Sequence, residues 1–260
     1  AAPGAGKGPH IQPPQKPVSF PESARTSPSP PLILIVIAND TEKNLRQLNE
    51  ELVGIKAALD PVRQKGFCEI DDIAAATPER LMAKLQAHRD CELILHYGGH
   101  GDRDAIFVDS AWGETRAQDL AAYLAHFDNI RLFFLNACLT LDQAALYRKA
   151  GLPAVIATDR RIGDESARDH AVAFYTALAS GTDLAGAFAE AKSGGALQAG
   201  SPRGSIPQAV LEQTGGSPWQ LFAADGAGEW RLPAFRKAHT IFLTQPPPAP
   251  PDAFTGRDKE

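Results

Sequence analysis

The sequence is poor in cysteine and has no long apolar run. Its 260 residues include three widely spaced cysteines, which do not suit a disulfide framework, so we expect free thiols and a cytoplasmic location. The longest apolar run, Leu32–Ala38, is far shorter than the roughly 18 residues that span a membrane. No basic stretch followed by an apolar segment opens the chain, so we expect no signal peptide. A membrane partner is therefore not expected.

Basic charge is also in deficit. Lys and Arg total 26 against 31 for Asp and Glu, which gives a net charge of −5. Binding to nucleic-acid phosphates depends mainly on an excess of basic side chains. A direct role in binding nucleic acid is therefore disfavoured.

The prolines divide the chain into three parts. Nine of the 21 prolines lie in residues 1–31 and five in residues 246–251. Residues 1–31 have too few apolar side chains to form a core, so we expect a disordered, proline-rich arm there. We expect one globular domain over residues 32–244. Residues 245–260 are expected to be a stiff linker and the start of a truncated following domain.

Within residues 32–244, segments typical of strands and of helices alternate. LILIVIA (32–38) is typical of a strand buried on both faces, and leucines three and four residues apart follow it. Asp40 or Thr41 is expected to cap that helix, and Thr77 the next one, which should bury Met82. This alternation predicts an α/β domain with a mostly parallel central sheet and helices on both faces. The expected strands are residues 32–38, 67–70, 91–96, 105–108, 130–135, 154–157, 219–222 and 229–232, and a long loop is expected over residues 194–218.

Three loops that follow expected strands carry the reactive side chains. HYGGHGD (96–102), NACLT (136–140) and TDRR (158–161) each follow a core strand. In open sheets of this class, ligands bind at the carboxyl ends of the strands. We therefore expect these three loops to lie on one rim of the sheet.

Cys138 and His100 are the candidate nucleophile and base. A cysteine between a strand and a helix N-terminus, with an imidazole nearby, is favoured as a thiolate. Glycines beside His100 allow close approach of a substrate, which makes Gly99 a candidate substrate contact. The backbone N–H groups of Gly101 and Cys138 are candidates for an oxyanion hole. On the residues alone, Cys138 as a buried, inert thiol remains an alternative.

Three segments resemble the catalytic blocks of CHAT domains, which are similar to caspases, separases and gingipains, the clan CD cysteine peptidases. These segments are ILHYGGHGD (94–102), RLFFLNACLT (131–140) and AGLPAVIAT (150–158). The resemblance covers roughly residues 32–232 and implies a caspase-like three-layer sandwich. It also implies that His100 is the catalytic histidine and Cys138 the nucleophile of a peptidase that cleaves a protein substrate without a metal or organic cofactor. Leu141 departs from the pattern, because family members often have glycine there.

The resemblance further implies that the loop at Asp159 and Arg160 helps to line the pocket for the residue before the cut bond. By charge pairing, Asp159 favours a basic residue in that pocket and Arg160 an acidic one. Both signs stay open, and the similarity to separases favours the basic residue.

The tail DAFTGRDKE (252–260) resembles the opening of the nucleotide-binding module of STAND NTPases. This resemblance implies a peptidase effector joined to NTPase and sensor domains of the same longer chain, as in bacterial immune proteins. The early GAGKG (4–8) is not a P-loop, because no Ser or Thr follows the lysine and no strand precedes it.

The same residues allow two other interpretations. His96, His100 and Cys138 offer zinc-ligand chemistry, but a four-residue spacing suits a metal on one helical face and His96 ends a strand, so no metal is expected. The main alternative to an enzyme is a non-catalytic caspase-like module that docks a partner protein, in which the two side chains are vestigial. Cys68 and Cys91 lie in apolar contexts and are expected to be buried and inert.

Overall fold

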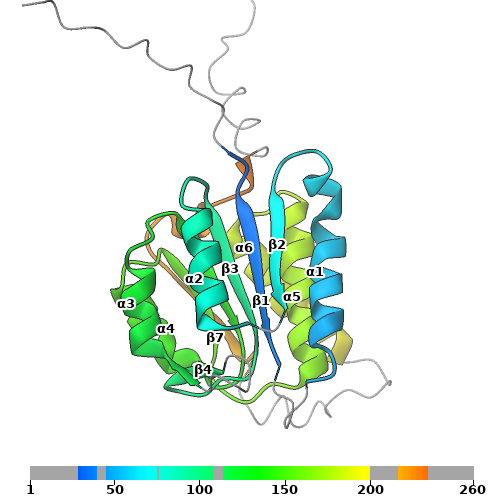
Figure 1. Ribbon diagram of the computed structural model, residues 1–260. Helices are drawn as coiled ribbons and strands as arrows, with labels where there is room; N and C mark the ends of the chain where they lie inside the picture. Colours follow the sequence, from blue (N-terminus) through cyan, green and yellow to red (C-terminus); the bar gives the residue numbers. More distant parts are fainter. Residues whose placement is uncertain (1–28, 40–44, 75, 108–113, 200–215, 234–260) are drawn as a thin grey trace, which may run out of the picture.

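A six-stranded sheet forms the centre of the molecule. The computed structural model describes residues 29–39, 45–74, 76–107, 114–199 and 216–233. The strand order is β2-β1-β3-β6-β7-β8, in which β8 alone runs antiparallel to its neighbour and the others are parallel. The strands are β1 (Leu32–Ala38), β2 (Glu69–Ala74), β3 (Leu93–Gly99), β6 (Ile130–Asn136), β7 (Ala154–Thr158) and β8 (Trp219–Ala223). A separate antiparallel pair, β4 (Ala105–Phe107) and β5 (Glu114–Arg116), lies near the carboxyl ends of the parallel strands (Figure 1).

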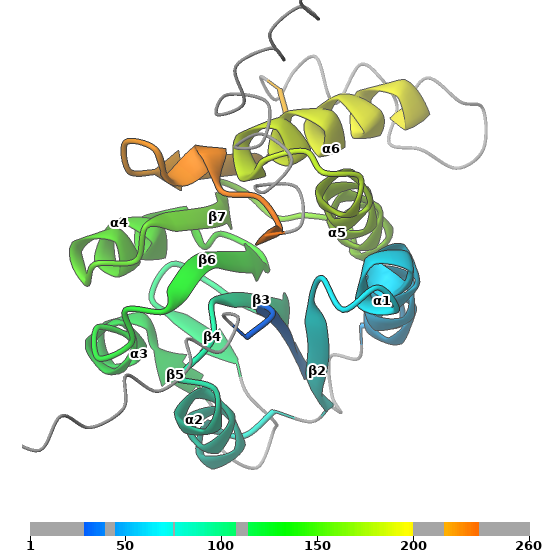
Figure 2. The same cartoon turned by 90° about the horizontal axis from the view of Figure 1, so that it is seen from above.

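Helices cover both faces of the sheet, which confirms the predicted three layers (Figure 2). One face carries α1 (Leu48–Arg63), α5 (Asp164–Ala179) and α6 (Leu184–Ala199), and the other carries α2 (Pro78–Ala87), α3 (Ala117–Leu124) and α4 (Leu141–Lys149). All seven residues of β1 are buried, as a strand between two helical layers requires. Its side chains alternate, with Leu34 and Val36 in the α2–α4 core and Ile33 and Ile35 in the α1–α5 core.

Several local predictions were wrong. Helix α1 begins at Leu48 with Gln47 at its N-cap, and the Asn39 side chain exchanges hydrogen bonds with the backbone of Leu45, ahead of the helix. Asp40 and Thr41 lie outside the described residues. Met82 is 39% exposed, since the buried stripe of α2 is Leu81 and Leu85. The capping of α2 by Thr77 is confirmed, because its side chain accepts a hydrogen bond from the N–H of Arg80.

The end of the domain also differs from the prediction. Residues 229–232 form no strand, because a short 3₁₀-helix, Ala227–Glu229, turns the chain so that Leu232 enters the α1–α5 core. Helix α6 runs into the segment expected to be a loop, and residues 200–215 lie outside the described part. The same holds for residues 1–28 of the expected arm and for the whole expected linker, residues 245–260.

His170 predicts a measurable pH dependence of stability. This side chain of α5 is buried and stacks on Trp219, with 4.1 Å between ring centroids. Burial lowers the pKa of His170 from 6.5 to about 3, so below pH 6.5 the unfolded chain takes up a proton that the folded chain excludes. The free energy of unfolding therefore decreases as the pH is lowered. His170 alone accounts for a loss of about 2 kcal/mol between pH 7 and pH 5.

His170→Phe keeps a planar ring and is expected to reduce the difference in unfolding free energy between pH 7 and pH 5 by about 2 kcal/mol. Urea denaturation at both pH values measures it. The exposed His126→Gln is the matched control and should keep the difference of the unchanged protein. Equal pH dependence in all three proteins would show that His170 does not resist protonation.

Candidate active site

The histidine loop lies directly against the turn that carries Cys138. A Cβ atom added at Gly101 would come 3.0 Å from the Cβ of Ala137 and 3.1 Å from the Cγ2 of Thr140. Contacts that short are tighter than ordinary packing, so a side chain at position 101 would push the two loops apart by a few tenths of an ångström, and glycine allows their close approach. Both loops come from the carboxyl ends of adjacent parallel strands, β3 and β6. The prediction that the His100 loop and the Cys138 loop lie together at one rim of the sheet is confirmed.

The turn that carries Cys138 has an unusual backbone conformation. Cys138 follows the end of β6, Leu139 has a φ of 57°, and α4 begins at Leu141 after the N-cap Thr140. A leucine in the left-handed region is disfavoured and is held there by its surroundings. Thr158 provides part of that support: its N–H donates to Thr140 Oγ1 (3.1 Å), and its hydroxyl donates to the carbonyl of Ala137.

The loop after β7 closes on the thiol of Cys138. The N–H of Ile162 points to Cys138 Sγ at 3.5 Å, and Sγ lies 3.8 Å from the carbonyl oxygen of the same residue. The N–H of Leu139 donates to the carbonyl of Arg160 (3.3 Å). All three predicted loops therefore meet at one rim. The half-buried Cys138 contacts both of the other loops, through its carbonyl near Gly101 and its thiol near Ile162.

The His100 loop is fixed mainly by its backbone. The carbonyl of His100 accepts hydrogen bonds from the N–H of Phe107 (3.1 Å) and the hydroxyl of Tyr97 (2.7 Å). Burial raises the pKa of Tyr97 far above its ordinary value, so this hydroxyl stays a donor. His100 itself is half-buried, next to the short β4–β5 pair.

Gln143, which the sequence analysis did not single out, connects the two halves of the site. It is fully buried on α4, and its Nε2 donates to the carbonyls of Asp102 (2.6 Å) and Ala105 (2.8 Å) in the His100 loop. Its Oε1 accepts a hydrogen bond from Tyr147 (3.1 Å). The helix that begins beside Cys138 thereby also holds the loop that carries His100.

A buried polar cluster supports β6 just before Cys138. Asn136 donates to Glu51 Oε1 (2.8 Å) and to the carbonyl of Ala167 (2.9 Å), and its Oδ1 accepts from Trp219 Nε1 (3.1 Å). His96 Nε2 lies 2.8 Å from the same oxygen of Glu51. His96 is thus a core histidine bonded through Nε2, but its buried Nδ1 has no hydrogen-bond partner among the described residues, so the expectation of a fully satisfied ring was wrong in part. In the described part of the chain, no three His, Cys, Asp or Glu side chains are grouped to hold a metal ion.

Asp159 and Arg160 form a two-pronged ion pair beside the thiol loop. Arg160 Nε donates to Asp159 Oδ1 (2.6 Å) and Nη2 to Oδ2 (3.0 Å), while Gln220 Nε2 lies 3.4 Å from Oδ2. The hydrogen bond from Arg160 lowers the pKa of Asp159, so the carboxyl is ionised at neutral pH. Both side chains are partly exposed, at 25% for Asp159 and 29% for Arg160.

Gly99 has a packing role in the structure. It is buried at the end of β3, and a Cβ there would lie 2.6 Å from the carbonyl oxygen of Ala38 and 2.7 Å from the Tyr97 hydroxyl. Glycine is required at this position for that reason, whether or not substrate also touches it. Cys68 is buried, and burial raises the pKa of its thiol to about 12, whereas Cys91 is only half-buried.

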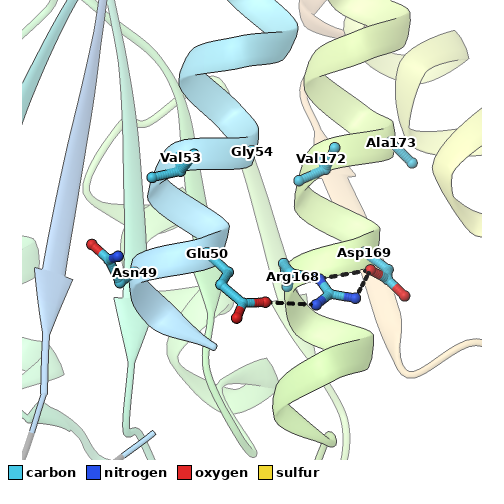
Figure 3. Close-up of a pocket in the computed structure, with 8 residues that line it drawn as sticks. All are labelled: Asn49, Glu50, Val53, Gly54, Arg168, Asp169, Val172 and Ala173. Atoms are coloured by element: carbon cyan, nitrogen blue, oxygen red, sulfur yellow. Dashed lines mark hydrogen bonds and ion pairs between the residues drawn. The ribbon is translucent and has the colours of Figure 1, made fainter. Parts of the chain in front are cut away.

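An open groove of about 690 Å³ lies between α1 and α5 (Figure 3). Arg168 of α5 bonds Glu50 of α1 across it, and it also bonds its own neighbour Asp169. None of the residues predicted for the site lines it. Across the described residues, no helix is long and apolar enough to cross a membrane.

Comparison with known proteins identifies the family. Residues 8–202 match the model of the CHAT domain. The chain belongs to the CHAT domain family. Among curated proteins none matches this sequence.

Three solved structures share the fold of this CHAT domain. A secreted C11 cysteine protease from Bacteroides thetaiotaomicron superimposes with a TM-score of 0.53 at 12% identity, over 76% of this chain and 67% of that one. The Arg-specific cysteine proteinase gingipain R gives 0.51 at 14% identity, over 78% of this chain, which spans about half (48%) of that structure. Caspase-1 from Spodoptera frugiperda gives 0.51 at 13% identity, over 75% and 87% of the two chains. Family and fold together confirm the prediction of a caspase-like cysteine peptidase domain.

Gln143→Leu is expected to destabilise the CHAT domain by about 2–4 kcal/mol, because the carbonyl of Asp102 and the Tyr147 hydroxyl lose their bonds to Gln143, and the carbonyl of Ala105 keeps only the N–H of Asp102. Urea denaturation measures the loss. Hydrogen exchange should accelerate first at the amides of Asp102 and Phe107, in the His100 loop. Gln118→Leu, exposed on α3, is the control and should change stability by less than about 0.5 kcal/mol. A uniform rise in exchange over the whole domain would contradict a local role for Gln143.

Proposed function

We propose that this CHAT domain is an endopeptidase that cleaves a protein substrate, with Cys138 as the nucleophile and His100 as the general acid and base. The observation that carries the proposal is the close packing of the two loops at Gly101, beside a third loop that touches the thiol. A cysteine peptidase needs a nucleophile and an imidazole on opposing loops with space between them for a peptide bond.

The reaction follows from these roles. The Cys138 thiolate attacks the carbonyl carbon of the peptide bond and forms a tetrahedral intermediate, which collapses to a thioester when His100 protonates the leaving amine. His100 then takes a proton from water, and the hydroxide releases the acid product and the free thiol. No metal or organic group takes part in these steps.

Two backbone groups support stabilisation of the oxyanion. The N–H groups of Gly101 and Cys138 make no hydrogen bond with another described residue. They flank the contact between the two loops, where the carbonyl oxygen of the substrate would develop its charge. Leu141, the departure from the family pattern, begins α4 without interrupting it, so it gives no support to a vestigial site.

Asp159 is proposed to select a basic residue before the cut bond. Its ionised carboxyl lies on the loop that contacts the thiol, and it already binds a guanidinium in two-pronged geometry. Gingipain R, which has the same fold, is an Arg-specific proteinase, in agreement with this choice. Within a longer chain, the tail at residues 252–260 supports a role as the effector of a STAND-type NTPase, whose sensor would control cleavage in a bacterial immune or signalling response.

Digestion of a diverse peptide library, read by mass spectrometry, tests the activity. We expect cuts after Arg or Lys that fall at least about 10³-fold in both Cys138→Ala and His100→Ala, since each removes a group needed in the transition state. Cys91→Ala removes a thiol outside the site and is the matched control, which should cleave at the unchanged rate. Cuts that persist in Cys138→Ala would sink the proposed mechanism. A partner that binds both the unchanged domain and Cys138→Ala, with no cuts by either, would favour the docking module instead.

Asp159→Asn tests the specificity separately. It keeps the size of the side chain but removes the charge, so kcat/KM for peptides with Arg before the cut should fall by about 10²-fold while Cys138 still reacts with a small alkylating agent at the unchanged rate. Unchanged cleavage after Arg would place the selecting group elsewhere.

A further inference from the structure

The acidic group proposed to recognise the substrate is already occupied by a residue of the same chain. Arg160 places Nε and Nη2 on the two oxygens of Asp159 at 2.6 and 3.0 Å. A substrate arginine binds a carboxylate with the same fork of two parallel N–H donors. One carboxylate accepts only one such fork in its plane, so the two guanidinium groups compete.

The backbone and the side chain of Arg160 make separate bonds. The backbone is anchored, because its carbonyl accepts the N–H of Leu139, the residue after Cys138. The side chain, by contrast, is 29% exposed and bonds Asp159 through its guanidinium. A change of rotamer therefore opens Asp159 while the turn at Cys138 stays in place.

We propose that Arg160 is a built-in competitor that occupies Asp159 until a substrate arginine or lysine displaces it. This inference rests on the proposed function and deepens it, because it assigns a residue that sets the affinity of the same pocket. When a binding-competent state is only partly populated, the apparent dissociation constant rises by the inverse of that fraction. A partly exposed ion pair of this kind leaves roughly one molecule in five competent, so removing Arg160 should tighten binding about fivefold.

Arg161 offers a matched control. It carries the same charge one residue further along and is exposed, without an ion pair or hydrogen bond to the described residues. Any general effect of removing a positive charge near the site appears in Arg161→Ala as well. An effect of releasing Asp159 appears only in Arg160→Ala and in Arg160→Gln, which keeps part of the stem.

The experiment measures binding in the Cys138→Ala background, so that it does not depend on turnover. The probes are two acetylated tripeptide amides that differ only in a final Arg or Asp, titrated by calorimetry. We expect Arg160→Ala and Arg160→Gln to bind the Arg peptide about fivefold more tightly, Arg161→Ala to stay within twofold, and Asp159→Asn to abolish the gain when combined with Arg160→Ala.

Three results would overturn the proposal: equal tightening in Arg160→Ala and Arg161→Ala, no change or no binding of the Arg peptide in any variant, or binding of the Asp peptide that is lost in Arg160→Ala. The last would make Arg160 the reader of an acidic residue. Library digestion by the domain with Cys138 intact distinguishes a failure of the competitor proposal from a failure of the proposed peptidase function. Cysteine-dependent cleavage after Arg, with no effect of Arg160→Ala on binding, would contradict the competitor role of Arg160 but not the peptidase activity. Tighter binding of the Arg peptide by Arg160→Ala, without any cleavage, would contradict the peptidase activity but not the competitor role.

Discussion

The site depends above all on the contact at Gly101. Two loops from adjacent parallel strands pack there so closely that a Cβ atom added at Gly101 would lie 3.0 Å from Ala137 and 3.1 Å from Thr140. A parallel sheet brings strand ends to one rim, but it does not set how closely two loops approach. Glycine at position 101 sets the approach, and the hydrogen bonds of Gln143 to the carbonyls of Asp102 and Ala105 hold it. One helix, α4, thus fixes both partners of the proposed dyad: Cys138 precedes its first turn, and Gln143, within that turn, holds the loop of His100.

The second constraint lies below the rim. Glu51 and His96 are removed from water, and a buried carboxylate is tolerated only when it is paired and hydrogen-bonded. Glu51 Oε1 is the partner that His96 and Asn136 share, and the amide of Asn136 also links α5 and β8. Since Asn136 lies two residues before Cys138, the end of β6 is held from the α1–α5 side by this cluster and from the α2–α4 side by Thr140 and Thr158. The left-handed conformation of Leu139 is the bend that these two sets of bonds enclose.

The sequence was sufficient for the elements that periodicity controls. The run at residues 32–38 could only be a strand buried on both faces, and the three reactive loops followed from strand ends. It was not sufficient for Gln143, because Thr140-x-x-Gln143 matches the capping-box pattern, in which glutamine would reach back to the cap. In the structure the side chain turns instead to the His100 loop, a choice that depends on a neighbour 38 residues or more away. The start of α1 was missed for a similar reason: Asn39 bonds the backbone of Leu45, which a local pattern of capping residues does not reveal.

The charges at residues 159 and 160 show why the sequence alone left the sign of the substrate open. Adjacent acid and base each suggest an opposite partner, and composition cannot rank them. In the structure Arg160 donates two hydrogen bonds to Asp159, so the pair is nearly neutral as a unit and attracts neither sign strongly from a distance. In either exchange one ion pair replaces another: a basic substrate side chain displaces Arg160 from Asp159, and an acidic one takes Arg160 away from Asp159. The proposed preference for a basic residue therefore rests on the carboxylate of Asp159, which already accepts a two-pronged guanidinium and can accept that of a substrate arginine close enough to replace Arg160 directly.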